Sequence, residues 1–151
     1  MPTKYRGTPD ETRALSALIN LLRASEAFNA SLQREAAAAE LSASQFGVLE
    51  ALLHLGPTCQ GELAVKLLRS GGSLTSVVAG LERRGLVERR REGSDKRYVT
   101  VRLTAKGERL IAGIFPTHAR TVARQFRALT APEQDELRRL CRKLGRSLEP
   151  G

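Results

Sequence analysis

A run of cationic side chains stands out in the middle of this sequence. Between Arg83 and Arg97 there are seven basic residues and three acidic ones. Guanidinium groups can pair with phosphate oxygens through two hydrogen bonds, and they suit a narrow, electronegative groove better than an ammonium does. This chemistry points to a polyanionic partner. The candidate binding residues that we take from this run are Arg89, Arg90, Arg91, Asp95, Lys96 and Arg97.

These candidates should differ in role. We expect Arg97 to enter a groove of the partner. A carboxylate beside a polyanion is useful only if it holds a neighbouring arginine, so we assign Asp95 an orienting role. Arg90 should point away from Arg89 and Arg91, because side chains alternate along a strand, and at least one of the three is then a plain surface charge.

The segment before this run predicts an amphipathic helix over Gly71 to Arg84. Its apolar residues recur at the i, i+3, i+4, i+7 spacing of a buried helix face. They are Leu74, Val77, Val78 and Leu81. The other face is small and polar, as a helix that lies in a groove requires. Its candidate contact residues are Ser73, Thr75, Ser76 and Arg83. Short hydroxyls discriminate poorly between bases, whereas Arg83 is long enough to reach a phosphate or a guanine.

A shorter helix is expected before this one, and a hairpin after it. The shorter helix is predicted over Glu62 to Leu68. On this supporting helix and beside it, further candidates for contacts with DNA phosphates are Gln60, Lys66 and Arg69. Gly85 should end the second helix. Two strands should then follow, Val87 to Arg91 and Arg97 to Leu103. Helix, turn, helix and basic hairpin is the order of a winged helix-turn-helix, which binds DNA.

Further helices are predicted at both ends of the chain. The first should begin with Asp10 as its cap, and later ones with the capping boxes Ser42 to Gln45 and Thr130 to Glu133. Thr104 should cap a long helix that contains Pro116. The apolar stripes of the terminal helices have no third layer in this chain to cover them. Pairing with a second copy would cover them and give a twofold dimer. Alternatively, these helices pack on their own module.

The expected fold is therefore mainly α with a small β-hairpin wing. We expect residues 1–9 to form a flexible tail and residues 10–151 a single domain. Within it, residues 10–40 and 105–148 should dimerise, and residues 42–104 should form the DNA-binding lobe. In a dimer, the two lobes would meet DNA about one helical turn, roughly 34 Å, apart and would read an inverted repeat.

Composition narrows the class of protein. The 151 residues carry a formal net charge of +9, with 41% hydrophobic residues and no tryptophan. No apolar run approaches the roughly 18 residues of a membrane span, and the N-terminus lacks a signal peptide, so we expect a cytoplasmic protein associated with the nucleoid. The two cysteines lie far apart, and the two histidines lack partners at ligand spacing, so we expect no metal or cofactor. No catalytic constellation is present, and we expect no enzyme.

Two residues have alternative interpretations. Cys59 stands where a capping box with Glu62 would have a hydroxyl, and the positive end of a helix dipole could make its thiol reactive. This permits a thiol-based redox regulator. If Thr58 is the cap instead, Cys59 is a small buried side chain. His118, near Pro116, could line a pocket for the carboxylate of an effector, or form an ordinary hydrogen bond.

Several motifs together resemble one known family. They are SASQFGVLEAL, LGPTCQGELAVKL, SGGSLTSVVAGLERRGLVERR, Asp95-Lys96-Arg97, VRLTAKG and Pro116-Thr117-His118. Their order and spacing resemble the MarR transcription regulators from about Leu41 to Leu148. The resemblance implies a homodimer with interleaved terminal helices. It also implies a repressor or other regulator that often releases DNA when a small aromatic acid, phenol or oxidant acts on it.

The resemblance also assigns roles in the wing. Asp95 and Arg97 match a D-x-R signature in which the arginine enters the minor groove and the aspartate helps to hold the wing. The oxidant sensors of the family use a cysteine in the first helix, where this chain has none. We therefore expect a ligand-responsive, homodimeric DNA-binding repressor. The alternative is a basic architectural protein that binds nucleic acid without sequence preference, or the redox regulator through Cys59.

Overall fold

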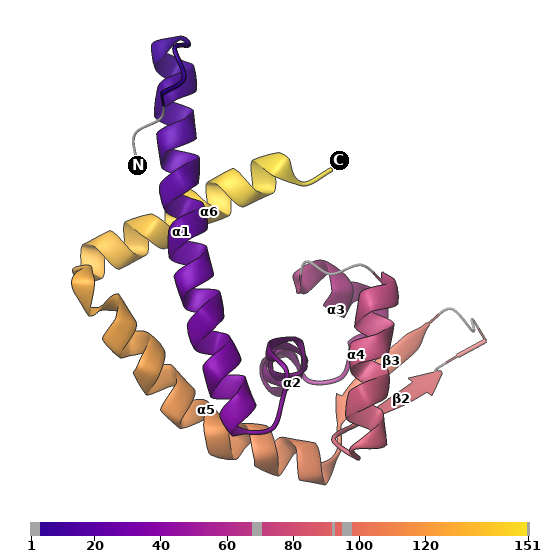
Figure 1. Cartoon of the computed structure of the whole chain (residues 1–151). Coiled ribbons are helices and arrows are strands. Elements are labelled where there is room, and N and C mark those ends of the chain that lie inside the picture. The colour runs from indigo at the N-terminus through magenta and orange to yellow at the C-terminus, as the bar shows by residue number, and fades with distance from the viewer. Residues whose placement is uncertain (1–3, 68–70, 92, 95–97, 151) are drawn as a thin grey trace. The chain divides into compact units, whose positions relative to one another are not determined.

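The computed structural model describes residues 4–67, 71–91, 93–94 and 98–150. Helices make up most of it (Figure 1), as expected. In chain order the elements are α1 (Pro9–Ala38), α2 (Ala43–Leu55), β1 (Thr58–Cys59), α3 (Gln60–Lys66), α4 (Gly71–Arg83), β2 (Val87–Arg91), β3 (Val99–Leu103), α5 (Ala105–Gln125), the short 3₁₀ helix η1 (Phe126–Ala128) and α6 (Ala131–Leu148).

The chain divides into two compact units. The first comprises Met1–Gly113 and the second Ile114–Gly151, so α5 begins in one unit and ends in the other. The first unit contains the predicted helix-turn-helix and the wing. We call residues 87–103 the wing. No helix in the described part of the chain is long and apolar enough to cross a membrane.

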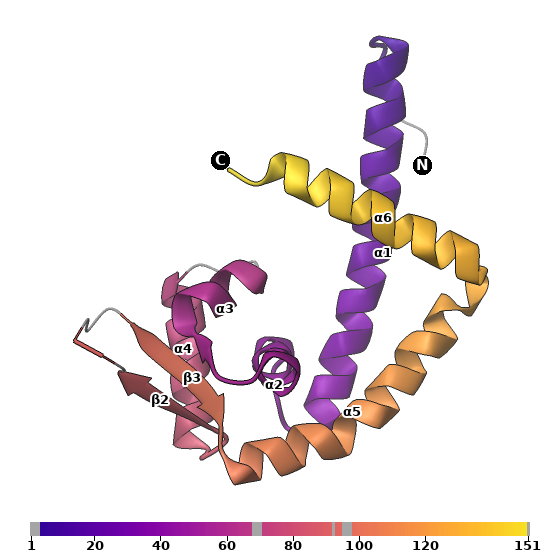
Figure 2. The ribbon, with the colours of Figure 1, turned by 180° about the vertical axis from the view of Figure 1, so that it is seen from behind.

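The sheet of the first unit has three strands, not the two of the predicted hairpin. β1 joins the hairpin, and the antiparallel order is β1-β3-β2. Thr58 pairs with Val101, and Cys59 with Thr100. The prediction for β2 is confirmed, whereas β3 begins at Val99 rather than at Arg97, which lies outside the described residues. Figures 1 and 2 show α4 against one face of this sheet.

An aliphatic core holds the helices of the first unit to the sheet. The predicted inward face of α4 is confirmed, because Leu74, Val78 and Leu81 are buried, while Val77 is half-buried. The other fully buried large side chains come from α2, α3, the turn before β2, the strands and α5. They are Val48, Leu49, Leu52, Leu63, Leu86, Val87, Val101 and Ile111. This core fixes which face of α4 is left for solvent.

The first helix begins two residues earlier than predicted. Thr8, rather than Asp10, is the cap: its hydroxyl accepts a hydrogen bond from the Glu11 amide, and the Glu11 carboxylate accepts one from the Thr8 amide. Pro9 occupies the first helical position, where its missing N–H costs nothing. Asp10 lies in the first turn instead and is paired with Arg13.

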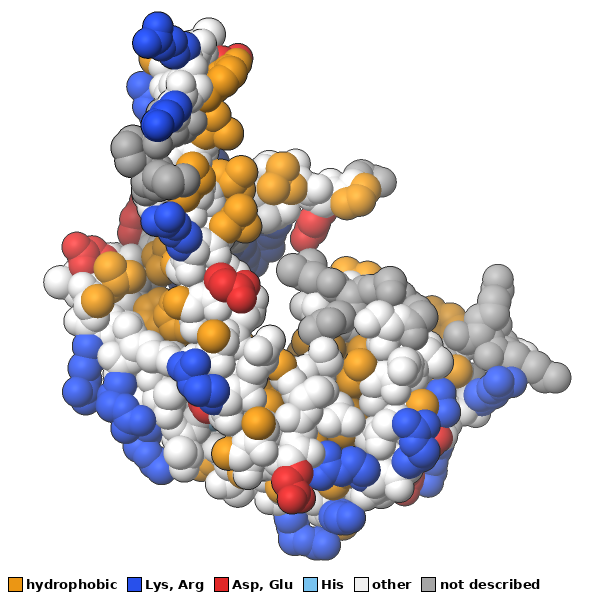
Figure 3. Space-filling model, viewed as in Figure 1, with side chains coloured by type: hydrophobic (Ala, Val, Ile, Leu, Met, Phe, Trp, Pro, Cys, Tyr) orange, Lys and Arg blue, Asp and Glu red, His pale blue; other side chains and the backbone are white. Residues whose placement is uncertain are grey.

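Helix α1 changes character along its length. Ser31 and Ala36 are buried near its C-terminal end, where α1 packs on α2. Towards its N-terminus, the side chains of Leu18, Leu21 and Leu22 are 40–58% exposed. Figure 3 shows this apolar surface along the upper part of the helix. About half of α1 therefore presents leucines to solvent within one chain.

The junction between α4, the wing and α5 is tightly built. Gly85 ends α4 at a φ of 71°, its amide donates to the Glu82 carbonyl, and the Leu86 amide donates to the Leu81 carbonyl. The Thr104 hydroxyl donates to the Gly85 carbonyl at 2.6 Å and accepts from the Gly107 amide at 3.0 Å. Thr104 is thus the predicted cap of α5, and it also ties α5 to the end of α4.

The second unit consists of the rest of α5, η1 and α6. The predicted capping box of Thr130 and Glu133 begins α6, and α5 continues through Pro116. The predicted stripe on α6 is present, and its leucines are 39–75% exposed. It comprises Leu137, Leu140, Cys141, Leu144 and Leu148.

Candidate nucleic-acid interface

Helix α4 presents the predicted polar face to solvent. All four of its candidates are exposed, and they lie between the buried positions of the helix. They are Ser73, Thr75, Ser76 and Arg83. Arg83 stands in the last turn, where a cation also suits the negative end of the helix dipole. Because the core holds the opposite face, α4 can meet a groove without loss of packing.

The supporting helix α3 holds α4 by a side-chain hydrogen bond. Gln60 Nε2 donates to Thr75 Oγ1 at 2.7 Å, and Gln60 Oε1 is buried without a hydrogen-bond partner among the described residues. Gln60 therefore positions a hydroxyl of α4, a role that the sequence did not indicate. Of the two other candidates near α3, Lys66 is exposed, and Arg69 lies outside the described residues.

An ion pair braces the wing against α4. The Arg89 guanidinium lies 3.0 Å from Glu82 Oε1 and donates also to Oε2, which accepts the Arg89 amide at 3.2 Å. Hydrogen bonds from the Arg89 side chain hold the pKa of Glu82 below its ordinary value. A guanidinium engaged in this way is less available to a phosphate. Its clearest role is to fix the angle between α4 and β2.

The predicted alternation of the arginines on β2 agrees with the contacts of Arg89 and Arg90. Arg89 meets α4, whereas Arg90 lies 3.7 Å from Glu88 on the other face of the strand. Glu88 is also paired across the sheet with Arg102 at 3.1 Å. Arg91 is exposed at the end of β2. Asp95, Lys96 and Arg97, at the predicted wing tip, lie outside the described residues.

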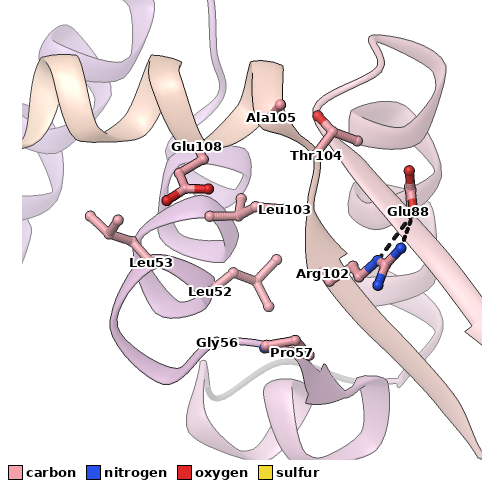
Figure 4. Close-up of a pocket in the computed structure, with 10 residues that line it drawn as sticks. All are labelled: Leu52, Leu53, Gly56, Pro57, Glu88, Arg102, Leu103, Thr104, Ala105 and Glu108. Atoms are coloured by element: carbon pink, nitrogen blue, oxygen red, sulfur yellow. Dashed lines mark hydrogen bonds and ion pairs between the residues drawn. The ribbon is translucent and has the colours of Figure 1, made fainter.

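A pocket of about 390 Å³ lies behind the wing, on the sheet face that carries Glu88 and Arg102. Figure 4 shows it between the end of α2, the base of the wing and the start of α5. Leu53 and Leu103 form an apolar part of its wall, and Glu108 adds a second carboxylate to that of Glu88. With two carboxylates and one guanidinium in its lining, this pocket disfavours an anionic ligand. His118 is not among the residues that line it.

The remaining candidates are Cys59 and His118. Cys59 occupies the cap position of α3 and is half-buried, but its thiol forms no capping hydrogen bond. The cap position belongs to Cys59 and not to Thr58, whose hydroxyl donates to the Gly56 carbonyl. The His118 ring lies 5.7 Å from the ring of Phe115. Among the described residues, no group of three His, Cys, Asp or Glu side chains could hold a metal ion.

The fold and this surface define a winged helix-turn-helix protein of the DNA-binding class. A MarR family model matches residues 39–97, from the end of α1 to the wing tip. A solved structure of a MarR family protein from Bacillus stearothermophilus is 31% identical, covers 90% of this chain and 96% of its own, and has a TM-score of 0.63. The chain belongs to the MarR family of transcriptional regulators, which are not enzymes.

Two further similarities extend this result. The HTH-type transcriptional regulator YkoM of Bacillus subtilis is 39% identical over 102 residues, which are 68% of this chain and 66% of that protein. The structure of NadR in complex with 4-hydroxyphenylacetate is 26% identical, covers 95% of this chain and 97% of its own, and has a TM-score of 0.75.

Proposed function

We propose that this protein is a homodimeric, effector-responsive repressor that binds an inverted-repeat operator through α4 and the wing. The observation that carries this proposal is the exposed polar face of α4, held beside a wing that Arg89 braces through Glu82. Such a module presents a rigid helix to a major groove and a basic hairpin to the flanking backbone. A regulator of this kind would act in the cytoplasm, on the nucleoid.

The dimer is supported by the exposed leucines at both ends of the chain. Leu18 and Leu22 on α1, and Leu140 and Leu144 on α6, are 47–58% exposed in the single chain. Burying such stripes against a second copy would remove apolar area from water, worth about 25 cal/mol per Å². In the dimer that we propose, the twofold axis would present two copies of α4 to one side of a duplex, as an inverted repeat requires.

Specificity would come more from geometry than from base contacts. The hydroxyls of Ser73, Thr75 and Ser76 discriminate bases weakly, so the spacing of two half-sites and the shape of the groove would carry much of it. Arg83 would contact phosphate or guanine. We assign Arg97 to the minor groove and Asp95 to its orientation, as the family resemblance implies.

An aromatic acid is the effector class that we favour. The support is NadR, whose structure contains 4-hydroxyphenylacetate and which shares 26% of its residues with this chain. The pocket behind the wing does not suit such a ligand, because Glu88 and Glu108 face it with only Arg102 to balance them. We therefore propose that the effector binds elsewhere, with His118 as a candidate partner of its carboxylate.

Substitutions in α4 and the wing test the DNA-binding part of this proposal. Arg83→Ala and Arg97→Ala should each weaken binding, and each should make the slope of log K against log salt shallower by about 0.9 if one phosphate contact is lost. Arg34→Ala removes the same charge from an exposed position of α1 and is the control. If both variants behave like the control, α4 and the wing do not form the DNA surface.

A further inference from the structure

Helix α6 carries a dense set of cations that the proposed function does not use. Five of the nine residues from 138 to 146 are basic, and all five are exposed. They line one shallow hollow on the helix surface. We call them the α6 basic face: Arg138, Arg139, Arg142, Lys143 and Arg146. At about 100° per residue, they lie on the side of the helix opposite to the leucine stripe.

Little within the described residues neutralises this face. Glu136 pairs with Arg139 at 2.6 Å, and this hydrogen bond from Arg139 holds the pKa of the Glu136 carboxyl below its ordinary value. Asp135 lies on the same side, one turn before Arg139. Both carboxylates precede the cations, and none follows until Glu149. The central and C-terminal part of the α6 basic face therefore keeps its positive charge.

The stability of the helix does not account for this arrangement. A cation favours the negative end of a helix dipole, but that effect fades beyond the last turn, which here holds Arg146 alone. The proposed dimer uses the leucine side and leaves the basic side unused. The second unit, from residue 114 onward, contains eight Lys and Arg against four Asp and Glu. Nearly half of the net charge of +9 thus lies outside the winged module.

The chemistry of the α6 basic face fits the phosphate backbone of DNA. Four of its five cations are arginines, whose planar fork binds phosphate through two hydrogen bonds. Three of the arginines lie about one helical turn apart from one another: Arg138, Arg142 and Arg146. Together they span about 12 Å along the helix, which leaves room for successive phosphates of one DNA strand. No aromatic side chain accompanies them in α6 to stack on a base. An anionic membrane fits less well, because a surface helix binds it by inserting its apolar side, which the proposed dimer buries.

From these observations we infer that the α6 basic face is a second, sequence-independent DNA contact, separate from α4 and the wing. This inference rests on the proposed dimer in one respect only: the dimer interface occupies the leucine side of α6. The second contact would hold DNA that flanks the operator, or a second duplex. Its contribution should appear in the salt dependence, since each phosphate neutralised releases counterions.

The test compares two triple variants of the full chain on a mixed-sequence duplex several times longer than one operator. The first changes Arg138, Arg142 and Arg146 to Gln. The control changes Arg120, Arg124 and Arg127 to Gln, which removes the same charge from exposed positions of the same unit. Affinity is measured between about 50 and 200 mM salt. The α6 variant should lose up to about 2.7 units of slope, and the control much less.

Other measurements make the result decisive. Circular dichroism and the oligomeric state check that the α6 variant is folded. If the triple variant does not fold, the single Arg142→Gln variant takes its place and should lose up to about 0.9 units of slope. Equal slopes for the α6 variant, the control and the unmodified protein would overturn the inference. So would an unchanged DNA slope together with lost binding to vesicles of phosphatidylglycerol and phosphatidylcholine, which would assign the face to lipid. Loss of slope in Arg97→Ala alone would support the winged module and leave α6 without a DNA role.

Discussion

At the scale of single residues, Cys59 shows how an ordinary capping site can lack its usual side chain. Its backbone, at a φ of −60° and a ψ of 136°, has the extended conformation of a helix cap, yet its thiol forms no capping hydrogen bond. Glu62 stands three residues later, as in a capping box. The geometry for a cap is thus present without the hydroxyl that would use it.

Restoring a hydroxyl at this position should therefore stabilise the protein. Cys59→Ser is expected to raise the free energy of unfolding by about 0.5–1 kcal/mol, because a serine oxygen can accept the Glu62 amide hydrogen. Urea denaturation measures the change. An unchanged or lower midpoint would contradict the prediction that a hydroxyl at this position caps α3.

The same variant also tests redox control. If peroxide abolishes DNA binding by the unmodified protein but not by Cys59→Ser, this result would support a redox sensor.

The ion pair between Glu82 and Arg89 predicts a dependence on pH. Hydrogen bonding from Arg89 lowers the pKa of Glu82 in the folded state, so the unfolded chain takes up a proton first as the pH falls. The stabilisation is complete above the ordinary Glu pKa of about 4.3 and is lost as the pH falls through the lower folded-state value.

Glu82→Gln should accordingly melt below the unmodified protein at neutral pH, and the difference should shrink in acid. The effect should stay under about 1 kcal/mol, since the Glu82 side chain is 40% exposed and its pair is screened by solvent. Melting temperatures measured from neutral pH to about pH 3 follow the change. A difference that is constant over this range would mean that the ion pair does not stabilise the fold.

At the scale of elements, the start of α5 depends on close backbone contact. A Cβ at Gly107 would overlap the carbonyl oxygen of Leu86, whereas a Cβ at Gly113, farther along the helix, would meet nothing within 4 Å. Gly107→Ala should destabilise the protein by about 1–3 kcal/mol through overpacking. Gly113→Ala is the matched control and should stabilise it by up to about 1 kcal/mol. Similar unfolding midpoints for the two variants would refute this contact.

Local signals were enough to predict most elements. The periodicity of Leu74, Val78 and Leu81 identified α4 and its buried side, and capping boxes identified the starts of α2 and α6. The start of α1 also carries a local signal, because Thr8 and Glu11 form the same type of capping box with Pro9 between them. Asp10 competes with this signal in the sequence, because aspartate is also a common cap.

Features that depend on distant partners could not be predicted in this way. β1 is only two residues long, and its pairing is decided by β3, about forty residues later. Likewise, Gln60 and Arg89 each carry the signature of a phosphate contact, but the fold brings them to Thr75 and Glu82. A long polar side chain serves either role, and only the tertiary neighbours decide between them.

At the scale of the whole molecule, dimerisation should depend on the leucine side of α6. Leu140→Glu places a charge in the stripe and should convert the proposed dimer to a monomer at equal concentration, because burying an unpaired carboxylate is costly. Arg142→Gln lowers the net charge by the same amount on the opposite side and should remain dimeric. Size-exclusion chromatography with light scattering distinguishes these states. A dimeric Leu140→Glu protein would remove the α6 stripe from the interface.

The most direct test of the central claim is a selection of genomic DNA fragments by the purified protein at near-physiological salt. A dimer with two α4 helices predicts one shared inverted repeat, with half-sites about one helical turn, roughly 34 Å, apart. Leu140→Glu should then lose its preference for the paired site over a single half-site. Recovery of fragments with no common motif would contradict specific regulation and would favour a protein that binds nucleic acid without regard to sequence.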